Sequence, residues 1–327
     1  MKKRWFIYTA PLFLPILVLL VLISFSRPNI YCFVLCFILL ILLFSSSKLR
    51  AASTSKLPLS IMLFMALLAC FTPWMTPFSP EQQDINLGKD TNLMGIDALG
   101  RDIFARLLYA NRSSLVKAGA GSFLANAIVL LFAFMLHTFR GYWKKGLDVF
   151  LQTFLSFPVI LLFLMGASLG ELYFDTMGPL YMILLVGVTL WAEPAKMTQA
   201  RMDDLAHAEF IQAAELAGLG KVGLFYKEML PNLKPLLVVN FLLVFIHAIT
   251  LEAILGFMGI GLIVGEPNLG RMIYSGLNAL AQDPWTFFSA LGVFLFWIFM
   301  MRFFVNRIDR KRRYRNSLVF RGREGNF

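Results

Sequence analysis

The stretch EFIQAAELAGLGKVGLFYKEMLPN, Glu209–Asn232, decides how this chain is organised, because it is polar and helix-forming and lies between two long apolar runs. The small pair Ala213 and Ala214 is followed by Gly218, and then by Leu230 and Pro231. Glycine permits a bend and proline lacks the N–H of a helix interior, so the pattern predicts a short helix, a bend and a second helix that proline stops. The small residues would let a bulky partner approach closely. We interpret this hairpin as a docking element for a cytoplasmic partner.

The composition is that of an all-α, polytopic membrane protein. The chain is 58% hydrophobic and only 15% charged, with a mean hydropathy of +0.71. A membrane helix needs roughly 20 apolar residues, and about eight stretches approach this length. The predicted spans are Trp5–Phe25, Ile30–Phe44, Leu57–Met75, Ala118–Phe139, Leu147–Gly170, Thr176–Met197, Pro235–Met258 and Trp285–Val305. The second is short, so it is either a tilted span or a partly interfacial helix.

The distribution of charge predicts the orientation. The net charge is +11, but no nucleic-acid motif accompanies it. With both termini in the cytoplasm, 23 of the 30 Lys and Arg residues fall on the inner side, as the positive-inside rule requires. The run RIDRKRRYR, which continues into a basic cytoplasmic tail at 311–327, is typical of an anchor on anionic lipid. The basic cluster from Arg101 to Lys117, on the outer side, is an exception that the rule does not explain.

The chain is predicted to form one membrane domain with an appendage. Residues 1–56 are an N-terminal transmembrane hairpin with a cytoplasmic linker, and residues 57–310 are the core. The core contains an extracytoplasmic loop at 76–100 and a cytoplasmic loop at 198–234. A second outer segment, Gly259–Pro284, is rich in Gly and Pro and is expected to fold back at the membrane surface.

A second informative string, GIDALGRDIFARLLYANRSSL, covers Gly95–Leu115. Its glycines, Gly95 and Gly100, permit a tight turn, and Asp102 is suited to cap the following helix. From Ile103 onward apolar residues recur at helical spacing. We expect an interfacial helix that leads into a span and carries Arg106 and Arg112 on its surface.

These two strings resemble motifs of binding-protein-dependent ABC importer permeases. The first is similar to the "EAA" coupling loop, with Glu209, Gln212 (where Glu is usual), Ala213, Ala214, Gly218, Leu230 and Pro231 at the family's spacing. The second resembles the G-T-D-x-x-G-R-D segment of the oligopeptide, dipeptide and nickel branch. Its matching residues are Gly95, Asp97, Gly100, Arg101 and Asp102, with Ile96 in place of Thr.

Further landmarks follow in the family's order, so that the resemblance extends over roughly two-thirds of the chain, from Gly95 to Arg310. They are Gly141-Tyr142, Asp148, Phe157-Pro158, Pro231-Asn232 and an L-G-F-L-G-x-G-like turn with Gly256, Gly259 and Gly261. The chain departs from the pattern after Gly261, where it has only Pro267, and at Leu269, where Trp is common. The hairpin before Leu57 is also extra, because these permeases usually have six spans.

The resemblance implies a type I ABC importer permease-like core in the cell (inner or plasma) membrane. It also implies a second, homologous permease subunit, two cytoplasmic ATPase subunits and an extracytoplasmic substrate-binding protein. ATP would be bound and hydrolysed on the partners, so that this chain is no enzyme. The ATP-driven closure of those ATPases would move the Glu209–Asn232 hairpin as a lever. Peptides are the expected cargo and nickel or a metal chelate the alternative. A secondary transporter is the alternative from another class.

Several other features predict no site of their own. Gly218–Lys221 resembles a phosphate loop only faintly, because Glu215 and Val222 stand at required positions. The three histidines, His137, His207 and His247, lack metal-ligand spacing, and we expect no catalytic, cofactor-binding or metal-ligating residue.

Three acids fall within predicted spans, and each is expected nearer a membrane face than its midplane. They are Asp148, Glu193 and Glu252. The pairs Phe157-Pro158 and Glu193-Pro194 should kink their helices.

Overall fold

The computed structural model describes residues 79–81, 94–173, 178–260 and 266–324, together with Thr72 and Thr76. The predicted spans Trp5–Phe25 and Ile30–Phe44, nearly all of Leu57–Met75, most of the loop 76–100 and the landmark Gly261 lie outside these residues. The chain divides into two compact units, Met1–Ser79 and Pro80–Phe327. The second unit contains all the helices described below.

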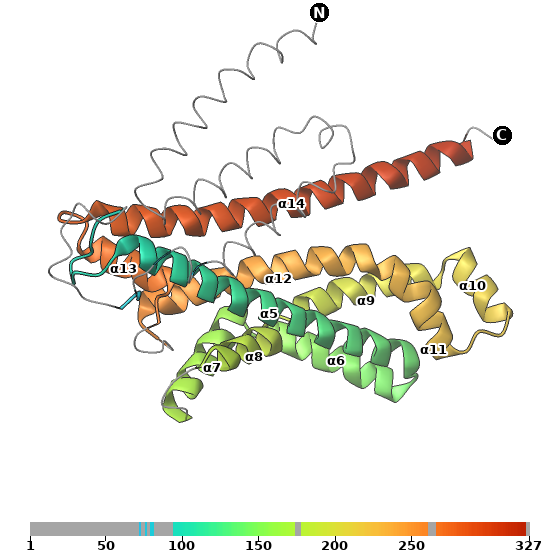
Figure 1. Ribbon diagram of the computed structural model, residues 1–327. Coiled ribbons are helices and arrows are strands. Elements are labelled where there is room, and N and C mark those ends of the chain that lie inside the picture. Colours follow the sequence, from blue (N-terminus) through green and yellow to red (C-terminus); the bar gives the residue numbers. More distant parts are fainter. Residues whose placement is uncertain are drawn as a thin grey trace, which may run out of the picture. The chain divides into compact units, whose positions relative to one another are not determined.

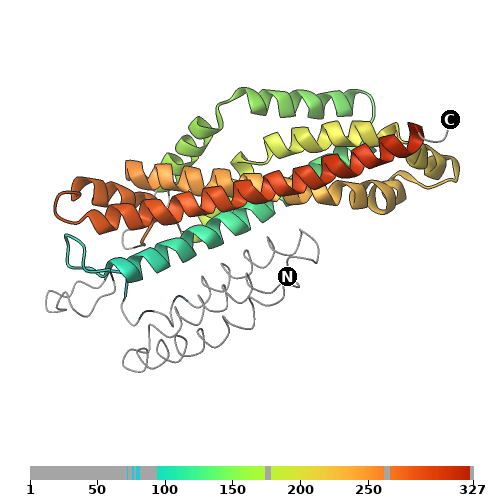
Figure 2. The ribbon, with the colours of Figure 1, turned by 90° about the horizontal axis from the view of Figure 1, so that it is seen from above.

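The second unit is built of helices (Figures 1 and 2). In chain order they are α5 (Ile103–Thr138), α6 (Tyr142–Ser156), α7 (Val159–Tyr173), α8 (Pro179–Thr189), α9 (Ala192–Ala206), α10 (Glu209–Leu216), α11 (Lys221–Gly223), the π-helix η1 (Leu224–Met229), α12 (Leu230–Met258), α13 (Leu269–Asn278) and α14 (Pro284–Glu324). Among the described residues the sole β-type pairing is an isolated bridge between Ile96 and Asp102. The predicted all-α class is confirmed.

Three helical stretches in the described part are long and apolar enough to cross a membrane, namely Ile103–Thr138, Lys221–Met258 and Pro284–Asn306. Two bent pairs add up to two more: α6 with α7, and α8 with α9. Each of these stretches or pairs overlaps one of the five spans predicted after residue 100.

The core lies where α5 and α12 pack against each other and against their neighbours. α5 contacts α8, α9 and α12, while α12 also contacts α13 and α14. A Cβ atom at Gly121 would lie 2.4 Å from Val186, and one at Gly187 would lie 2.5 Å from Leu124. Close packing through small residues is typical of helix pairs in membranes. α14 is joined to α5 by a hydrogen bond of 2.6 Å from the Trp297 indole to Asn111.

The predicted helix from Ile103 that leads into a span is the beginning of α5, a single helix of 36 residues. Its first turns are continuous with the span, and Asp102 caps it by accepting a hydrogen bond from the Phe104 amide at 2.9 Å. Arg106 was expected on the surface but is only 2% exposed. Its guanidinium is buried because it forms an ion pair with Asp97, a partner that precedes the helix and could not be found from helical spacing.

The second helix of the hairpin is also longer than predicted, because Pro231 does not stop it. The helical path runs from Lys221 to Met258, with Pro231 in the first turn of α12 and Pro235 inside it. A proline removes a main-chain hydrogen bond and crowds the carbonyl four residues earlier. Just before it, η1 has the wider π-helical turn, and the Asn232 side chain donates to the Glu228 carbonyl at 2.7 Å. These features accommodate the proline without ending the helix.

The kink predicted at Phe157-Pro158 is confirmed, whereas the one predicted at Glu193-Pro194 lies a few residues earlier; both breaks line one cavity. α6 and α7 are bent by 83° at Phe157 and Pro158, and α8 and α9 are bent by 41°. The second break falls at Leu190 and Trp191, so Pro194 lies in the first turn of α9, where a proline costs no intrahelical hydrogen bond.

Candidate functional site

The predicted bend at Gly218 is a helix C-cap of the Schellman type. Gly218 has a φ of +84°, a conformation that glycine adopts without the strain of a Cβ atom. The Leu219 amide donates to the Ala214 carbonyl at 3.1 Å, and the Gly218 amide donates to the Glu215 carbonyl at 3.0 Å. These two hydrogen bonds satisfy the last carbonyls of α10 and turn the chain sharply towards α11.

The hairpin formed by α10, α11 and η1 is fixed to the ends of α5 and α9. Its buried side chains share an apolar cluster with those helices; the cluster contains Ala133, Met202, Leu205, Ile211, Leu224, Phe225, Met229 and Leu233. The Lys221 ammonium donates to the Thr138 carbonyl at 2.8 Å, and a His137 ring nitrogen lies 3.0 Å from the Lys221 carbonyl. Lysine thereby satisfies a carbonyl at the C-terminus of α5 that has no partner within its helix.

One face of α10 is exposed to solvent and contains three of the predicted coupling residues. Glu209, Gln212 and Ala213 are exposed, and Leu216 is 89% exposed. Ala214, by contrast, packs against the apolar cluster. The two alanines therefore have different environments: Ala213 is available to a partner, whereas Ala214 holds α10 against the protein.

The remaining coupling residues, Leu230 and Pro231, lie at the start of α12. Figures 1 and 2 show α10 and α11 at one end of this unit and α13, with the start of α5, at the other.

The Gly95–Asp102 segment forms a compact turn around one carboxylate at that other end. Asp97 accepts hydrogen bonds from the backbone amides of Leu99 and Arg101 at 2.9 and 3.0 Å. It also pairs with the guanidinium groups of Arg101 and Arg106, and Arg101 reaches Glu81 at 3.1 Å. Gly95 and Gly100 have φ values of +84° and +74°, so the predicted tight turn is confirmed. Three of the predicted landmark residues, Asp97, Arg101 and Asp102, thus share one hydrogen-bonded structure.

Burial acts against the charge of Asp97, but hydrogen bonds from Arg101 and the charges of Arg106 and Arg101 outweigh it. The net effect is to lower the pKa of Asp97 below its ordinary value. The carboxylate is therefore held in its charged form as the centre of the turn. The partners of this anion are Arg101 and Arg106. Both belong to the basic cluster Arg101–Lys117, which the positive-inside rule does not explain.

A second buried ion pair lies where α5, α12 and α13 meet. The Lys117 ammonium is 2.6 Å from Glu252, and the Asn268 amide donates to the same carboxylate at 3.1 Å. The Asn268 oxygen caps α13 by accepting from Gly270 at 2.8 Å. A Cβ atom at Gly256 would lie 2.1 Å from this oxygen, so the landmark glycine allows α13 to begin against α12. Gly259, with a φ of +75°, is the C-cap of α12.

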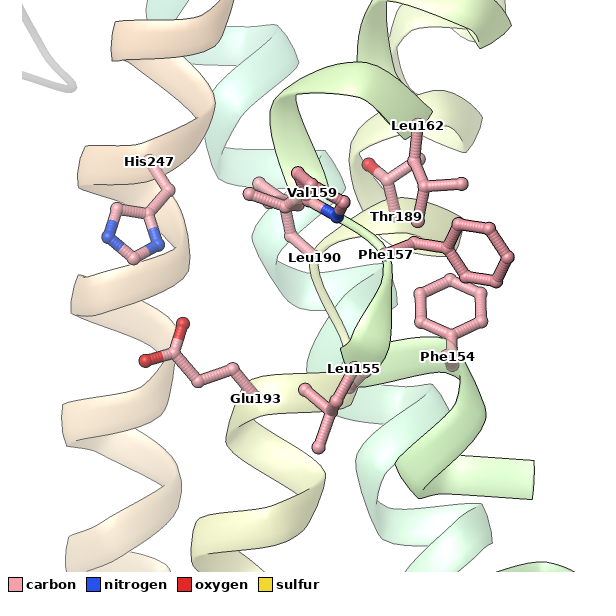
Figure 3. A pocket seen from close by; sticks show the side chains of 11 residues that line it. Phe154, Leu155, Phe157, Val159, Leu162, Thr189, Leu190, Glu193 and His247 are labelled. Atoms are coloured by element: carbon pink, nitrogen blue, oxygen red, sulfur yellow. The ribbon is translucent and has the colours of Figure 1, made fainter. Parts of the chain in front are cut away.

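The two helix breaks line a cavity of about 330 Å³. Its apolar wall includes Phe154, Leu155, Phe157 and Leu162, and its polar groups are Thr189, Glu193 and His247. Figure 3 shows Glu193 and His247 towards one side of the cavity, and Phe154 and Phe157 towards the other. From the sequence, His247 was expected to be an ordinary core or surface histidine, and Glu193 to lie nearer a membrane face than its midplane. In the structure they line one cavity, and His247 lies at the middle of the predicted span Pro235–Met258.

Glu193 and His247 are far apart in the sequence and on different helices, so their common cavity could not be predicted from their spacing. A signal was nevertheless present, since an ionisable residue at the middle of an apolar span is uncommon and marks a functional position. Within the described residues no group of three or more His, Cys, Asp or Glu side chains could hold a metal ion.

The sequence was compared with protein families and with characterised proteins. The family described as "Binding-protein-dependent transport system inner membrane component" matches residues 129–314, which include both bent pairs, the hairpin and α12. The oligopeptide transport system permease protein OppC of Lactococcus lactis subsp. cremoris is 28% identical, over 67% of this chain and 74% of its own.

Two further relatives differ in the cargo that their names give. The di/tripeptide transport system permease protein DppC of Pseudomonas aeruginosa is 28% identical, over 69% of this chain and 77% of its own. The nickel transport system permease protein NikC of Escherichia coli is 29% identical, over 73% of this chain and 87% of its own.

Proposed function

The chain belongs to the family of inner membrane components of binding-protein-dependent transport systems, and we propose that it is a permease subunit of an ATP-driven importer of short peptides. The observation that carries the proposal is the hairpin of α10, α11 and η1, which is packed on the ends of the membrane helices and leaves one face of α10 open. An importer whose ATPase is a separate subunit needs such a docked element.

The exposed face of α10 is the proposed docking surface for a cytoplasmic ATPase subunit. Glu209, Gln212 and Ala213 are exposed there, and the small Ala213 permits close approach. ATP binding and hydrolysis then reside on two such partner subunits, and this chain performs no chemistry itself. The charge distribution favours a cytoplasmic location for the loop 198–234 and for both termini, and an extracytoplasmic location for the loop 76–100.

The continuity of the helix after the hairpin suggests how the motion is passed on. Because the helical path runs unbroken from Lys221 to Met258, a displacement of the hairpin moves the whole of α12. The far end of α12 carries Glu252 and Gly256, which contact Lys117 of α5 and Asn268 before α13. A movement that begins at the ATPase is thereby transmitted to the opposite end, where a substrate-binding protein would deliver its cargo.

A second, homologous permease subunit completes the proposed pathway. In this chain many large apolar side chains of α6, α7 and the break between them are exposed, among them Phe150, Phe157, Leu161 and Met165. Membrane lipid or a second subunit must cover them. The proposed core is residues 57–310, with residues 1–56 as an appended transmembrane hairpin and 311–327 as a basic cytoplasmic tail.

Peptides are the proposed cargo, and nickel or a metal chelate is the second candidate. The relatives above carry both kinds of name. Among the described residues no group of three His, Cys, Asp or Glu side chains could hold a metal ion. The absence of such a ligand set favours peptides over a bare metal ion as the cargo.

The test combines deletion with purification from native membranes. Deleting the subunit should abolish ATP-dependent uptake of labelled short peptides, and the intact chain should copurify with ATPase subunits and a second permease. Unchanged peptide uptake together with lost nickel uptake would replace peptides by nickel. Purification of a transport-competent chain without any ATPase would favour a secondary transporter.

A further inference from the structure

The cavity beside Glu193 is formed by two interruptions of helix. The α6–α7 break contributes Phe157 and Pro158, and the α8–α9 break contributes Leu190. Within a membrane, backbone that is not helical is tolerated where it is buried in protein or lines a water-filled cavity. In many secondary transporters, broken helices form the site where substrate is bound, and the same physical reason applies to any membrane pathway. Two breaks that meet at one cavity therefore indicate a point on the cargo path.

The polar side of the cavity consists of ionisable groups that are exposed on apolar helices. Glu193 and His247 are both exposed in this chain. Ionisable residues at membrane depth face a bundle interior or a water-filled space rather than lipid. The face formed by the start of α9 and the middle of α12 therefore points towards the pathway.

Within the part of the chain that the structure describes, Glu193 and His247 lack the partners that the acids Glu252 and Asp148 have. Glu252 is paired with Lys117, and Asp148 accepts a hydrogen bond of 2.6 Å from Gln199. Within the described residues Glu193 and His247 form neither a hydrogen bond nor an ion pair. A carboxylate left unpaired in such a place is available to a ligand.

The position of Glu193 is nevertheless fixed by its neighbours. The Asn240 amide of α12 donates to the Pro194 carbonyl at 3.3 Å and to the Thr198 hydroxyl at 3.1 Å. On the other side Trp191 packs against Phe154, with ring centroids 5.4 Å apart. These contacts hold the first turn of α9 against α12, and His247 lies two helical turns after Asn240 on the same face.

From this geometry we propose that the cavity is a subsite for the free amino terminus of a peptide and its first apolar side chain. The inference rests on the proposed function as a peptide permease and goes beyond it. The Glu193 carboxylate accepts hydrogen bonds from the α-ammonium group, and the His247 imidazole can bond the same group or the first carbonyl. Phe154, Phe157 and Leu162 supply the apolar wall for the side chain.

The size and chemistry of the cavity favour this occupant over a metal ion. A volume of about 330 Å³ lies at the lower end of small-molecule sites, which suits the first residue or two of a peptide rather than a long one. Among the described residues that line the cavity, a bare metal ion would find one carboxylate and one imidazole, with aromatic rings opposite.

Occupancy is tested by photocrosslinking in the full transporter. A benzophenone amino acid replaces Phe157, and a radiolabelled tripeptide with an apolar first residue is added directly, without the binding protein, so that the binding protein cannot select it. The free peptide should crosslink roughly tenfold better than its N-acetylated form, the loss expected for one charge-assisted hydrogen bond. Crosslinking at Phe299, an exposed residue outside the cavity, should be weak and indifferent to acetylation.

The variant Glu193→Gln should remove the preference for the free amine, and Glu193→Asp should retain part of it. The matched control is Asp148→Asn, which removes a carboxylate outside the cavity and should leave crosslinking and uptake unchanged. Three outcomes would overturn the inference. They are equal crosslinking of the two peptides by the parent chain, a preference for the free amine that survives Glu193→Gln, and no crosslinking at position 157.

Uptake in cells separates failure of this inference from failure of the proposed function. If the parent chain supports peptide uptake and Glu193→Gln supports it equally well, the subsite is wrong and the peptide function stands. If deletion of the chain leaves peptide uptake intact, the peptide function fails and the subsite fails with it. If Glu193→Gln lowers nickel uptake but not peptide uptake, Glu193 acts as a metal ligand and the inference is wrong.

Discussion

The ammonium group of Lys117 lies 2.6 Å from the carboxylate of Glu252, and their side chains are only 7% and 4% exposed. Lys117 belongs to α5 and Glu252 to α12, the two helices that pack against each other in the core. Glu266, 3.9 Å from Lys117, adds a second and more exposed carboxylate. Through Asn268, whose amide donates to Glu252, the pair also joins these two helices to the start of α13.

Removing one member of this pair should destabilise the protein strongly. Lys117→Met leaves the Glu252 carboxylate buried without its cation, and the expected loss in free energy of unfolding is about 3–5 kcal/mol. Thermal unfolding of the purified transporter in detergent, followed by tryptophan fluorescence, measures the loss.

The matched control is the double variant Lys117→Met with Glu252→Gln, which removes both charges and keeps an oxygen that can accept from Asn268. It should recover most of the lost stability, because a buried ion pair adds little beyond a neutral replacement. Unfolding of Lys117→Met at the parent temperature would contradict the assignment of a buried pair.

Gly218 and Gly220 provide a matched test of the bend. Neither position has an atom within 4 Å of an added Cβ, but Gly218 has a φ of +84° whereas Gly220 has a φ of −65°. Gly218→Ala should therefore cost roughly 1–2 kcal/mol in backbone strain, and Gly220→Ala should be almost neutral.

Gly218→Arg should also abolish peptide uptake while the protein remains inserted, because a long charged side chain stands at the docking face.

The measurements are peptide uptake, membrane insertion and ATP hydrolysis stimulated by the loaded binding protein. Full uptake by Gly218→Arg would show that the hairpin does not couple the ATPase to transport.

The turn around Asp97 should respond to acid. Because the pKa of Asp97 is lowered in the folded protein, its charged form stabilises the fold. This contribution is complete above the unfolded-state pKa of about 3.9 and is lost as the pH falls through the lower, folded-state value. The difference in stability between the parent chain and Asp97→Asn should thus be constant from neutral pH down to about pH 4 and shrink only below it. A difference that already shrinks near pH 6 would assign the titration to another group.

The orientation can be tested with single cysteines in a chain from which Cys32, Cys36 and Cys70 have been removed. A cysteine at Leu216, which is 89% exposed on α10, should resist a membrane-impermeant thiol reagent in intact cells and react after permeabilisation. A cysteine at Gln83, in the predicted outer loop, should react in intact cells. Labelling at position 216 from outside would exclude a cytoplasmic ATPase as the partner of the hairpin.

Local sequence patterns predicted much of the secondary structure correctly, because their causes lie within a few residues. Gly218 was expected at a bend and has a positive φ, and Asp102 was expected to cap a helix and accepts the Phe104 amide. The kink at Phe157-Pro158 follows from the missing N–H of proline in the same way. Pro231 failed as a stop signal because the π-turn before it accommodates the ring, which is a feature of the surrounding helix rather than of the proline itself.

The sequence by itself determined the class, the family and the order of elements along the chain, since apolar length, charge asymmetry and spaced motifs are properties of the linear chain. Only the tertiary structure decided which charges pair and which remain free. Asp97 is paired with Arg106, and Lys117 with Glu252, whereas Glu193 and His247 line one cavity and have no partner among the described residues. The reason is that the cost of burying a charge depends on what lies within a few ångströms of it, and packing between distant helices sets that neighbourhood.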